Sequence, residues 1–453
     1  MLESLLGGFL YPLYESRLRG RQTLTYLTEY DAQQWLPAEE LQALQMRKLR
    51  RLLAHCQETV PYYRRRWKEL GLDWQDIRTQ ADFAELPLIS KDDIRAHYDD
   101  FVSEPWRGKT LRKTTGGSTG QPFSLEYTRE SYERRMAVMM RGYGWAGWRP
   151  GVKRLDVWGT ELGVQSIPRR IKTKAFDAAM GRRVLSCFEM HRDNIGEFVA
   201  EIDRYRPAVI VGYTGALETM AAWIADHRGA TWVPQAVITA AEMLSAEQRT
   251  LIQSSFRAPV FHTYGCREFM LIGAECAEHR GYHASADHLV IEVADDRGRP
   301  VHEGAGNIVL TDLHNDGMPF IRYLNGDMIH AHTDASPCAC GRGLPLLGAV
   351  EGRRLDMLTT PDGRFIPGEF FPHLIKDIPG IEAFQVRQTH ADQLVVLMVR
   401  PGDVPEAKLA FMRSAIDKVV GTDMKVEFRF VDEIPLTPSG KRRVAVREIA
   451  ASS

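Results

Sequence analysis

Apolar and polar residues alternate along the middle of the chain with two different periods, which predict helices and strands in turn. Between residues 130 and 330, short apolar runs such as 208–213 (AVIVGY) and 236–241 (AVITAA) are separated by segments of helical periodicity. Strands separated by helices of ten or more residues indicate a parallel sheet with helices on its faces. Ligands bind at the carboxyl ends of strands in such sheets, so polar residues that follow these strands are the first candidates for a site.

The two ends of the chain predict smaller units. Leucines between residues 38 and 55 recur at helical spacing and predict an amphipathic surface helix, and further helices begin near Pro61 and Ser90. The last hundred residues predict strands near 382–388 and 393–399, a helix at 405–420 and a strand at 426–431. We therefore expect an α/β protein, with a large N-terminal domain at 1–350 built on helix-flanked, mostly parallel sheets. A small, mobile α+β domain is expected at 351–453.

Composition bounds the class of protein. Apolar residues make up 44% and charged residues 26% of the 453 residues, as in ordinary globular proteins. The formal net charge of −1 argues against nucleic acid as a partner. No apolar run reaches bilayer length, and the six cysteines do not resemble a disulfide framework, so we expect a protein of the reducing cytoplasm.

The first twenty residues are apolar but do not have the pattern of a signal peptide. They carry an acid at position 3 and have neither a basic leader nor a cleavage site of small residues. One explanation is an anchor that lies in a membrane interface. The better one is an apolar arm that folds onto its own domain or onto the second chain of a homodimer.

A glycine-rich stretch at 114–122 (TTGGSTGQP) lies between two short segments of β character. Glycine lacks the Cβ that would block turns with φ above 0°, so such a loop can aim successive N–H groups at phosphate oxygens. It is not a Walker loop, because the GxxxxGK[ST] spacing is absent. The stretch predicts a hairpin tip that folds over a nucleotide, and a plain turn is the alternative if nothing downstream completes the site.

Acidic residues follow several of the predicted strands. The segments are TAAE at 239–242, YGCRE at 264–268 and FIRYLNGD at 320–327. An ionised carboxylate only accepts hydrogen bonds and ribose offers two donors, so Asp327, near Arg322, is a candidate for binding ribose hydroxyls. Any one of these acids could instead be a solvated loop carboxylate. Near the C-terminus, the loop PLTPSGK presents a lysine, Lys441.

Taken in order, these motifs and GRRLD at 352–356 resemble those of the adenylate-forming ligase superfamily, over nearly the whole chain. The resemblance is closest to the phenylacetate–CoA ligase-like branch, which includes ligase-like proteins associated with capsular polysaccharide synthesis. It implies that the glycine loop holds the β- and γ-phosphates of ATP. The residues of this loop are Thr114, Thr115, Gly116, Gly117, Ser118, Thr119 and Gly120.

The resemblance also assigns residues to the rest of the nucleotide. Glu268 is implied as the magnesium ligand, and Asp327 as the ribose ligand with Arg322 as its companion. Lys441 is implied to bridge the substrate carboxylate and the α-phosphate, and Arg353 is the arginine of the hinge region. The residues implied to lie around the adenine are Ala241, Glu242, Tyr264 and Gly265.

Two positions depart from the family pattern. Arg267 stands where the family usually has Ser or Thr before the acid, which places a guanidinium beside the phosphates and makes it a further catalytic candidate. At the hinge, Leu355 replaces a second acidic residue and leaves only Asp356. Both departures bear on whether the usual two-step cycle runs efficiently.

Cysteine and histidine residues form a second constellation within an insertion at about 276–340. Two cysteines one residue apart in a Pro/Gly turn, with a distant Cys and His, suit a tetrahedral zinc site, as in some members of this branch. The predicted ligands are Cys276, His283, Cys338 and Cys340, with His279 as the substitute for His283. Such a zinc ion would hold the loops together and not catalyse. Reduced, unliganded loop cysteines are the alternative.

The sequence therefore predicts an ATP- and Mg²⁺-dependent, AMP-forming ligase. A carboxylate attacks the α-phosphorus, and the resulting acyl-adenylate is transferred to CoA, with a small aryl or other carboxylic acid as substrate. One alternative is transfer to an amine, a hydroxyl or a carrier-bound thiol in polysaccharide or secondary metabolism. An alternative of another class is a catalytically weak assembly partner in a polysaccharide pathway.

Overall fold

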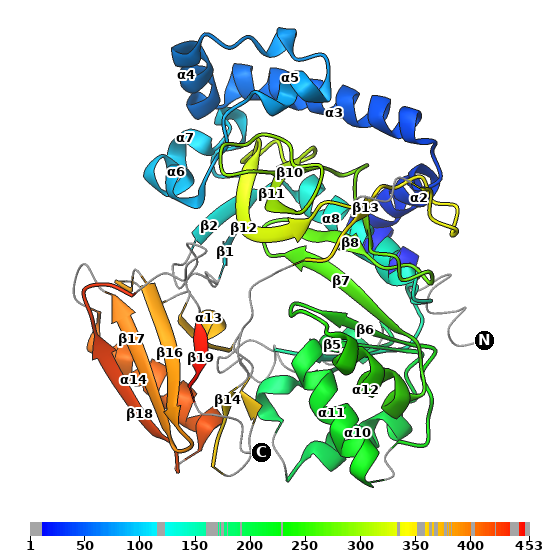
Figure 1. The fold of residues 1–453 in the computed structure, drawn as a ribbon, viewed down its shortest axis with the longest axis vertical. Helices are drawn as coiled ribbons and strands as arrows, with labels where there is room; N and C mark the ends of the chain where they lie inside the picture. Colours follow the sequence, from blue (N-terminus) through cyan, green and yellow to red (C-terminus); the bar gives the residue numbers. More distant parts are fainter. Residues whose placement is uncertain are drawn as a thin grey trace. The chain divides into compact units, whose positions relative to one another are not determined.

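Figure 1 shows the helices and strands of the chain in a computed structural model. The chain forms two compact units. Unit 1 comprises residues 1–113, 125–150 and 261–352, and unit 2 comprises residues 114–124, 151–260 and 353–453. The residues that the structure describes are 11–115, 123–159, 171, 173, 176–178, 180–190, 193–227, 230–332, 336–350, 358–361, 365–366, 370–375, 378, 380–381, 383–399, 404–421, 423–434 and 444–448.

The helices of unit 1 come from the first 150 residues. They are η2 (Leu13–Leu18), α2 (Thr23–Gln33), α3 (Ala38–Thr59), α4 (Pro61–Leu70), η3 (Trp74–Asp76), α5 (Gln80–Ala84), α6 (Lys91–Ala96), α7 (Tyr98–Phe101), η4 (Glu104–Trp106) and α8 (Arg129–Gly144). The predicted amphipathic helix is confirmed as α3, which buries Leu41, Leu49, Leu52 and Leu53. Proline at the first position of α4 fits a helix start, because its missing N–H has no partner there in any case.

The strands of unit 1 form antiparallel sheets. One sheet has the order β10 (Leu289–Ala294), β11 (Ala305–Asp312) and β12 (Tyr323–His330). The other strands follow the order β13 (Leu346–Leu347), β9 (Tyr282–Ala284), β8 (Met270–Ala274) and β7 (Val260–Cys266). The predicted alternation of strands and helices does not hold after β7, because the three residues 267–269 link it to β8. So short a link permits only an antiparallel neighbour.

Unit 2 contains the parallel sheet that the sequence predicts. Its strands follow the order β4 (Arg182–Ser186), β3 (Arg154–Trp158), β5 (Val209–Tyr213) and β6 (Ala236–Ala240), and every pair is parallel. The connecting helices are η5 (Cys187–Glu189), α10 (Ile195–Tyr205), α11 (Thr214–His227) and α12 (Ala246–Phe256). Residues 209–213 and 236–240 are all buried, as expected of strands covered on both faces.

The C-terminal part of unit 2 forms an α+β arrangement. Its elements are β14 (Leu358–Thr359), β15 (Phe365–Ile366), α13 (Phe370–Ile375), β16 (Ala383–His390), β17 (Gln393–Val399), α14 (Glu406–Val420), β18 (Lys425–Phe430) and β19 (Ala445–Arg447). The order β18–β17–β16–β19 makes one four-stranded sheet. These elements and the fold class agree with the prediction, whereas the domain boundary at 350 and the mobility of this region stay predictions.

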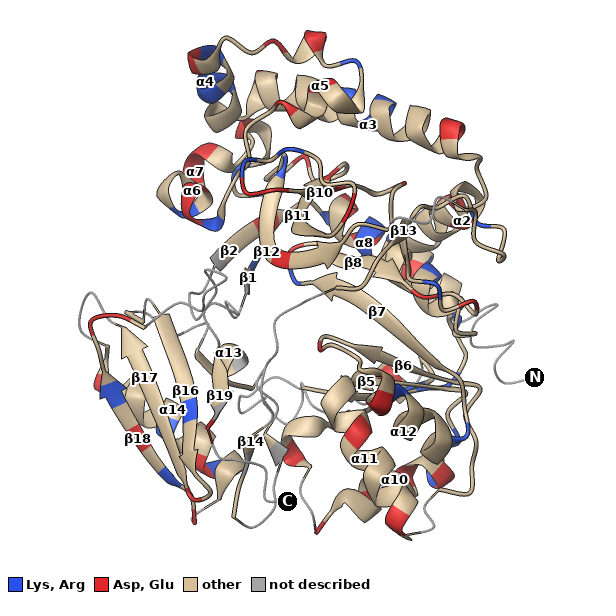
Figure 2. Ribbon diagram, viewed as in Figure 1, with Lys and Arg blue, Asp and Glu red and all other residues tan. Residues whose placement is uncertain are grey.

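A short two-stranded sheet, β1 (Leu111–Thr115) and β2 (Phe123–Tyr127), flanks the glycine loop. Elsewhere in the described part, α4 and α6 carry charged residues of both signs, whereas the charged residues of α7 are acidic (Figure 2). Arg65 pairs with Asp100 at 2.9 Å, and Arg95 with Asp92 at 2.6 Å.

Among the described helices, none is long and apolar enough to cross a membrane.

Candidate active site

The carboxyl ends of β5 and β6 in unit 2 carry the predicted adenine loop. Ala241 directly follows β6 and has a φ of 69°, which turns the chain sharply before Glu242. The Glu242 carboxylate accepts a hydrogen bond from the backbone N–H of Gly215 at 2.7 Å. Gly215 lies at the start of α11, where the helix dipole favours a negative charge. Glu242 therefore fixes the loop to this helix, and contact with adenine stays a prediction.

A hydrogen-bonded triad in unit 1 surrounds the predicted ribose ligand. The Tyr264 hydroxyl donates to Oδ2 of Asp327 at 2.9 Å, and the Asn325 amide donates to the same oxygen at 3.0 Å. Burial and the neighbouring Asp327 charge raise the pKa of Tyr264, so its hydroxyl remains a donor at neutral pH. The carboxylate of Asp327 is thus held in one orientation. Asn325 was not predicted, although its place two residues before Asp327 on β12 puts both side chains on one face.

Gly265 has a structural reason to be glycine. A Cβ at this position would lie 1.9 Å from the carbonyl oxygen of Met270 on the neighbouring strand β8. The β7–β8 register also shifts between Tyr264 and Gly265, which marks a bulge. Gly265 therefore permits the close strand pairing that places Tyr264 before the turn and Glu268 within it. Its predicted contact with the nucleotide is untested.

Glu268, the predicted magnesium ligand, lies in the turn between β7 and β8 and is only 5% exposed. Tyr323 donates a hydrogen bond to its Oε1 at 3.2 Å, and Nζ of Lys91 lies 3.2 Å from the same oxygen. Mg²⁺ prefers oxygen ligands, and a buried carboxylate beside a tyrosine hydroxyl fits that preference. Arg267, the neighbouring catalytic candidate, is exposed in the same turn.

The backbone of this turn is held by a buried arginine that was not predicted. Arg135 on α8 donates to the carbonyl oxygen of Glu268 and to Oδ2 of Asp312 at 2.6 Å. Arg135 and Asp312 are 3% and 1% exposed, so this ion pair is almost fully withdrawn from water. An arginine on the buried face of a helix was the only sequence signal for it. Arg135 thus fixes the backbone position of Glu268 through its carbonyl oxygen.

Arg322 is placed differently from the predicted companion of Asp327. Its side chain is buried and donates to Glu292 at 3.1 Å and to the carbonyl oxygen of Gly298 at 2.6 Å. It also donates to the carbonyl oxygens of Ala84 and Leu86. These contacts join the segment before α6 to β10 and β12. The contacts of Arg322 are thus structural, and a contact with nucleotide stays a prediction.

Arg322→Ala is expected to lower the free energy of unfolding by about 3–5 kcal/mol, because it leaves Glu292 and several carbonyl oxygens without their donor. Chemical denaturation measures this loss. Arg299→Ala is the control, since Arg299 is 69% exposed and pairs only on the surface with Asp295, and it should cost less than about 1 kcal/mol. Wild-type stability together with lost nucleotide affinity would contradict the structural role.

The four predicted metal ligands lie together in unit 1. The ligand atoms of Cys276, His283, Cys338 and Cys340 are all within 4.8 Å of one another. Sγ of Cys276 is 3.7 Å from Sγ of Cys338, and Sγ of Cys340 is 3.2 Å from Nε2 of His283. His279, the substitute ligand, instead lies 3.2 Å from the carboxylate of Glu275.

The orientation of His283 suits a metal ligand. Its Nδ1–H donates to the carbonyl oxygen of Leu344 at 3.0 Å, which leaves Nε2 toward the three thiols. Histidines that bind metals usually donate their other ring nitrogen in this way. Three sulfur atoms and one imidazole nitrogen are the donor set of structural zinc. The chemistry of the cluster therefore fits zinc.

Several predicted residues lie outside the described part of the chain. These are Gly116, Gly117, Ser118, Thr119, Gly120, Arg353 and Lys441. The side chain of Thr115 is likewise not described, whereas the Thr114 hydroxyl lies 3.4 Å from that of Ser124. The predicted roles of all of them in binding phosphate and in catalysis stay predictions.

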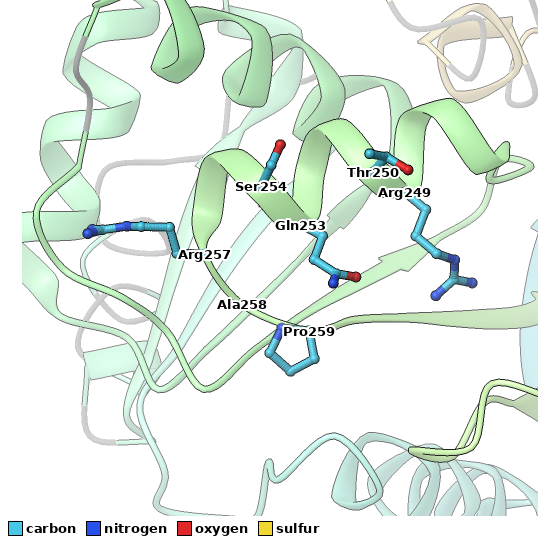
Figure 3. A pocket seen from close by; sticks show the side chains of 7 residues that line it. All are labelled: Arg249, Thr250, Gln253, Ser254, Arg257, Ala258 and Pro259. Carbon is cyan, nitrogen blue, oxygen red and sulfur yellow. The ribbon is translucent and has the colours of Figure 1, made fainter.

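A surface hollow of about 670 Å³ lies elsewhere on unit 2 (Figure 3). Its lining residues are Arg249, Thr250, Gln253, Ser254, Arg257, Ala258 and Pro259. Arg249 donates to the carbonyl oxygen of Val260 at 2.7 Å, so its guanidinium has a structural partner. The hollow lies where the chain enters β7, at the amino end of that strand, and ligands of such sheets bind at the carboxyl ends. It is therefore not the predicted nucleotide site.

Comparisons with known proteins agree with the motif order. A family model described as the CapK C-terminal domain matches residues 358–448. The phenylacetate–coenzyme A ligase of Thermus thermophilus is 31% identical over 334 residues, which cover 71% of this chain and 72% of the ligase. Protein CapK of Staphylococcus aureus is 23% identical over 419 residues, 90% of either chain.

The solved structures show the same fold. A crystal structure of 2-hydroxyisobutyryl-CoA ligase in the postadenylation state matches with a TM-score of 0.59 and 21% identity, over 92% of this chain and 91% of the ligase. The identity with the Thermus ligase confirms the predicted superfamily and the enzyme class, an AMP-forming acid–thiol ligase. The chain belongs to the phenylacetate–coenzyme A ligase family of adenylate-forming ligases.

Proposed function

We propose that this protein uses ATP to activate a small carboxylic acid and transfers the acyl group to CoA. In the first step a carboxylate oxygen bonds to the α-phosphorus and the bond to pyrophosphate breaks, giving an acyl-adenylate. In the second step the CoA sulfur bonds to the acyl carbon and AMP leaves. The Tyr264–Asn325–Asp327 triad carries the proposal, because it orients a carboxylate where the family resemblance assigns the ribose.

The residues of this chain act mainly by positioning and by charge. Asp327 accepts from ribose hydroxyls, and the loop after β6 faces the adenine. A bound magnesium ion, held by Glu268, would neutralise charge on the phosphates. Lys441 offsets charge on the α-phosphate as the carboxylate attacks. None of these roles needs a proton acceptor of unusual pKa, since phosphoryl transfer depends on alignment and charge neutralisation.

Exchange of radiolabelled pyrophosphate into ATP, over a panel of carboxylic acids, tests the proposal. The acid that the protein activates should stimulate exchange, because adenylation is reversible and needs no acceptor. The panel should include aryl acids such as phenylacetate and short hydroxy acids. Absence of exchange with every acid, in folded protein with Mg²⁺, would contradict adenylation.

The similarity to protein CapK supports a second candidate for the transfer step. That similarity spans 90% of each chain, and a CapK model matches the C-terminal region. In this version the adenylate is formed as above but the acyl group passes to an amine, a hydroxyl or a carrier-bound thiol. Consumption of the purified acyl-adenylate with CoA and with these acceptors separates the two candidates. A catalytically weak assembly partner would show neither exchange nor consumption.

Asp327→Ala is expected to weaken ATP binding by about 1.5–3 kcal/mol, because it removes a charged acceptor of ribose hydroxyls. Isothermal calorimetry with ATP measures the change. Asp316→Ala is the matched control, since Asp316 pairs at the surface with Arg51 in the same unit and should leave ATP affinity unchanged. Unchanged affinity in Asp327→Ala would remove the assignment of Asp327 to ribose.

The cysteine–histidine cluster supports a structural zinc ion as a further part of the proposal. Cys276, His283, Cys338 and Cys340 supply four ligands, which leaves a tetrahedral ion no open position for substrate. The ion would hold β9 to the loop that precedes β13. We assign it no step of the reaction.

A further inference from the structure

Lys91 lies against the carboxylate that is assigned to magnesium. Its Nζ is 3.2 Å from Oε1 of Glu268, and the two side chains are only 15% and 6% exposed. The hydroxyl of Tyr323 donates to the same oxygen at 3.2 Å. Because this ion pair is so far withdrawn from water, its charges are weakly screened. The ammonium charge of Lys91 therefore strongly repels any cation that approaches Glu268.

The position of Lys91 is set by the backbone. Ile89 forms a parallel β-bridge with Tyr323. The N–H of Ile89 donates to the carbonyl oxygen of Arg322 at 3.0 Å, and the N–H of Leu324 donates to the carbonyl oxygen of Ile89 at 2.9 Å. This bridge places the segment before α6 directly beside β12, whose first residue is Tyr323. Lys91 is therefore held beside Glu268 by a backbone segment that is hydrogen-bonded to β12.

The N-terminal cap of α6 also fixes the backbone position of Lys91. Ser90 caps the helix through a capping box with Asp93, in which the N–H of Ser90 donates to the Asp93 carboxylate at 2.8 Å. Lys91 is consequently the first residue of the helix. Arg322 anchors the same segment upstream, because it donates to the carbonyl oxygens of Ala84 and Leu86. The cap, the bridge and this anchor together hold Lys91 in place.

We propose that Lys91 competes with the nucleotide-bound magnesium ion for the Glu268 carboxylate and so sets the magnesium concentration that the protein needs. The inference rests on the proposed function, which assigns the metal to Glu268. Lys91 and Tyr323 together occupy the two lone-pair positions of Oε1, so a metal ion that binds this oxygen displaces one of them, and the charge of Lys91 opposes its approach. Lys91 is in this sense a positioning residue: it holds the carboxylate in place, and its charge opposes the metal.

Metal binding in the presence of a non-hydrolysable ATP analogue tests the competition without any turnover. Mn²⁺ replaces Mg²⁺, and electron paramagnetic resonance reports the free ion during a titration of the full chain. Lys91→Gln and Lys91→Met, which remove the charge, should both lower the half-saturating Mn²⁺ concentration about tenfold, since a competing cation is lost. Lys91→Arg keeps the charge and should not lower it. Lys68→Gln, at an exposed position of α4, is the matched control and should behave as wild type.

The outcomes decide for or against the competition. If both neutral variants are folded by thermal melting and bind Mn²⁺ no more tightly than wild type, or more weakly, the inference is overturned. A wild-type protein that binds no manganese–nucleotide overturns it as well. Pyrophosphate exchange on the same preparations keeps the proposed function separate. Tighter metal binding in the neutral variants without exchange in wild type would refute acid activation and leave the role of Lys91 standing.

Discussion

Cys338→Ser is expected to abolish binding of one zinc ion per chain and to lower the melting temperature by about 5–10 °C. The binding free energy of a structural metal is part of the folding free energy, and losing one of four ligands should cost about 3 kcal/mol or more. Cys338 is buried and lies 3.7 Å from Cys276, so a serine there cannot supply an equivalent ligand. Elemental analysis and thermal melting of the same preparations measure both effects.

Cys266→Ser is the control for this experiment. Cys266 is a free cysteine of the same unit that is not among the clustered ligands. Its replacement should leave the zinc content at one per chain and shift the melting temperature by little. A chelator should mimic Cys338→Ser in wild type and have no further effect on the variant. Wild-type protein that is purified without zinc and melts at the same temperature after zinc is added would refute the site.

The cysteine–histidine cluster and the parallel sheet were predictable for different reasons. Cysteines one residue apart in a Pro/Gly turn suit metal binding, so residue type and spacing, together with the family resemblance, pointed to Cys338 and Cys340. The β3–β5–β6 sheet was predictable because helices of more than ten residues separate its apolar runs, and helical links bring parallel strands together. In both cases the information lies within short segments of the chain.

The antiparallel part of unit 1 was not predictable in the same way. The turn between β7 and β8 has the sequence Arg267–Glu268–Phe269, without the Asn-Gly or Gly-Gly pair that marks a tight hairpin. The turn instead depends on a bulge at Gly265 and on a φ of 67° at Met270. Neither feature has a sequence signature strong enough to separate it from a strand that leads into a helix.

Some residues of the candidate site were likewise predictable from local sequence, and others were not. Asp327 and Glu268 were predicted because each belongs to a recognisable motif, although Asp327 lies within β12 and does not follow a strand as expected. Lys91 and Arg135 were not, since each reaches Glu268 from an element far away in the sequence. Their positions depend on tertiary contacts such as the Ile89–Tyr323 bridge. Motifs thus indicate groups that are proposed to contact the substrate, whereas the residues that hold those groups need the structure.

Lys441→Ala is expected to lower the rate of adenylation by a factor of about 10² to 10⁴ and to change ATP affinity little. The lysine lies in PLTPSGK, within the region that matches the CapK C-terminal model and outside the described residues. Its ammonium is proposed to offset charge that develops on the α-phosphate as the carboxylate attacks. An interaction made mainly in the transition state affects the rate and not the ground-state affinity.

The second half-reaction should survive the same change. We propose that Lys441 is delivered by a C-terminal region that rotates between the two steps, so thioester formation proceeds without it. Single-turnover adenylation and consumption of a chemically prepared acyl-adenylate are therefore measured on one preparation of the variant. Lys425→Ala is the matched control, because Lys425 is 78% exposed on β18 in the same region and should leave both rates unchanged. If Lys441→Ala adenylates at nearly the wild-type rate, or if both steps fail together in folded protein, Lys441 does not act in one half-reaction alone. Loss of adenylation with intact consumption is the one result that alternation between two conformations requires.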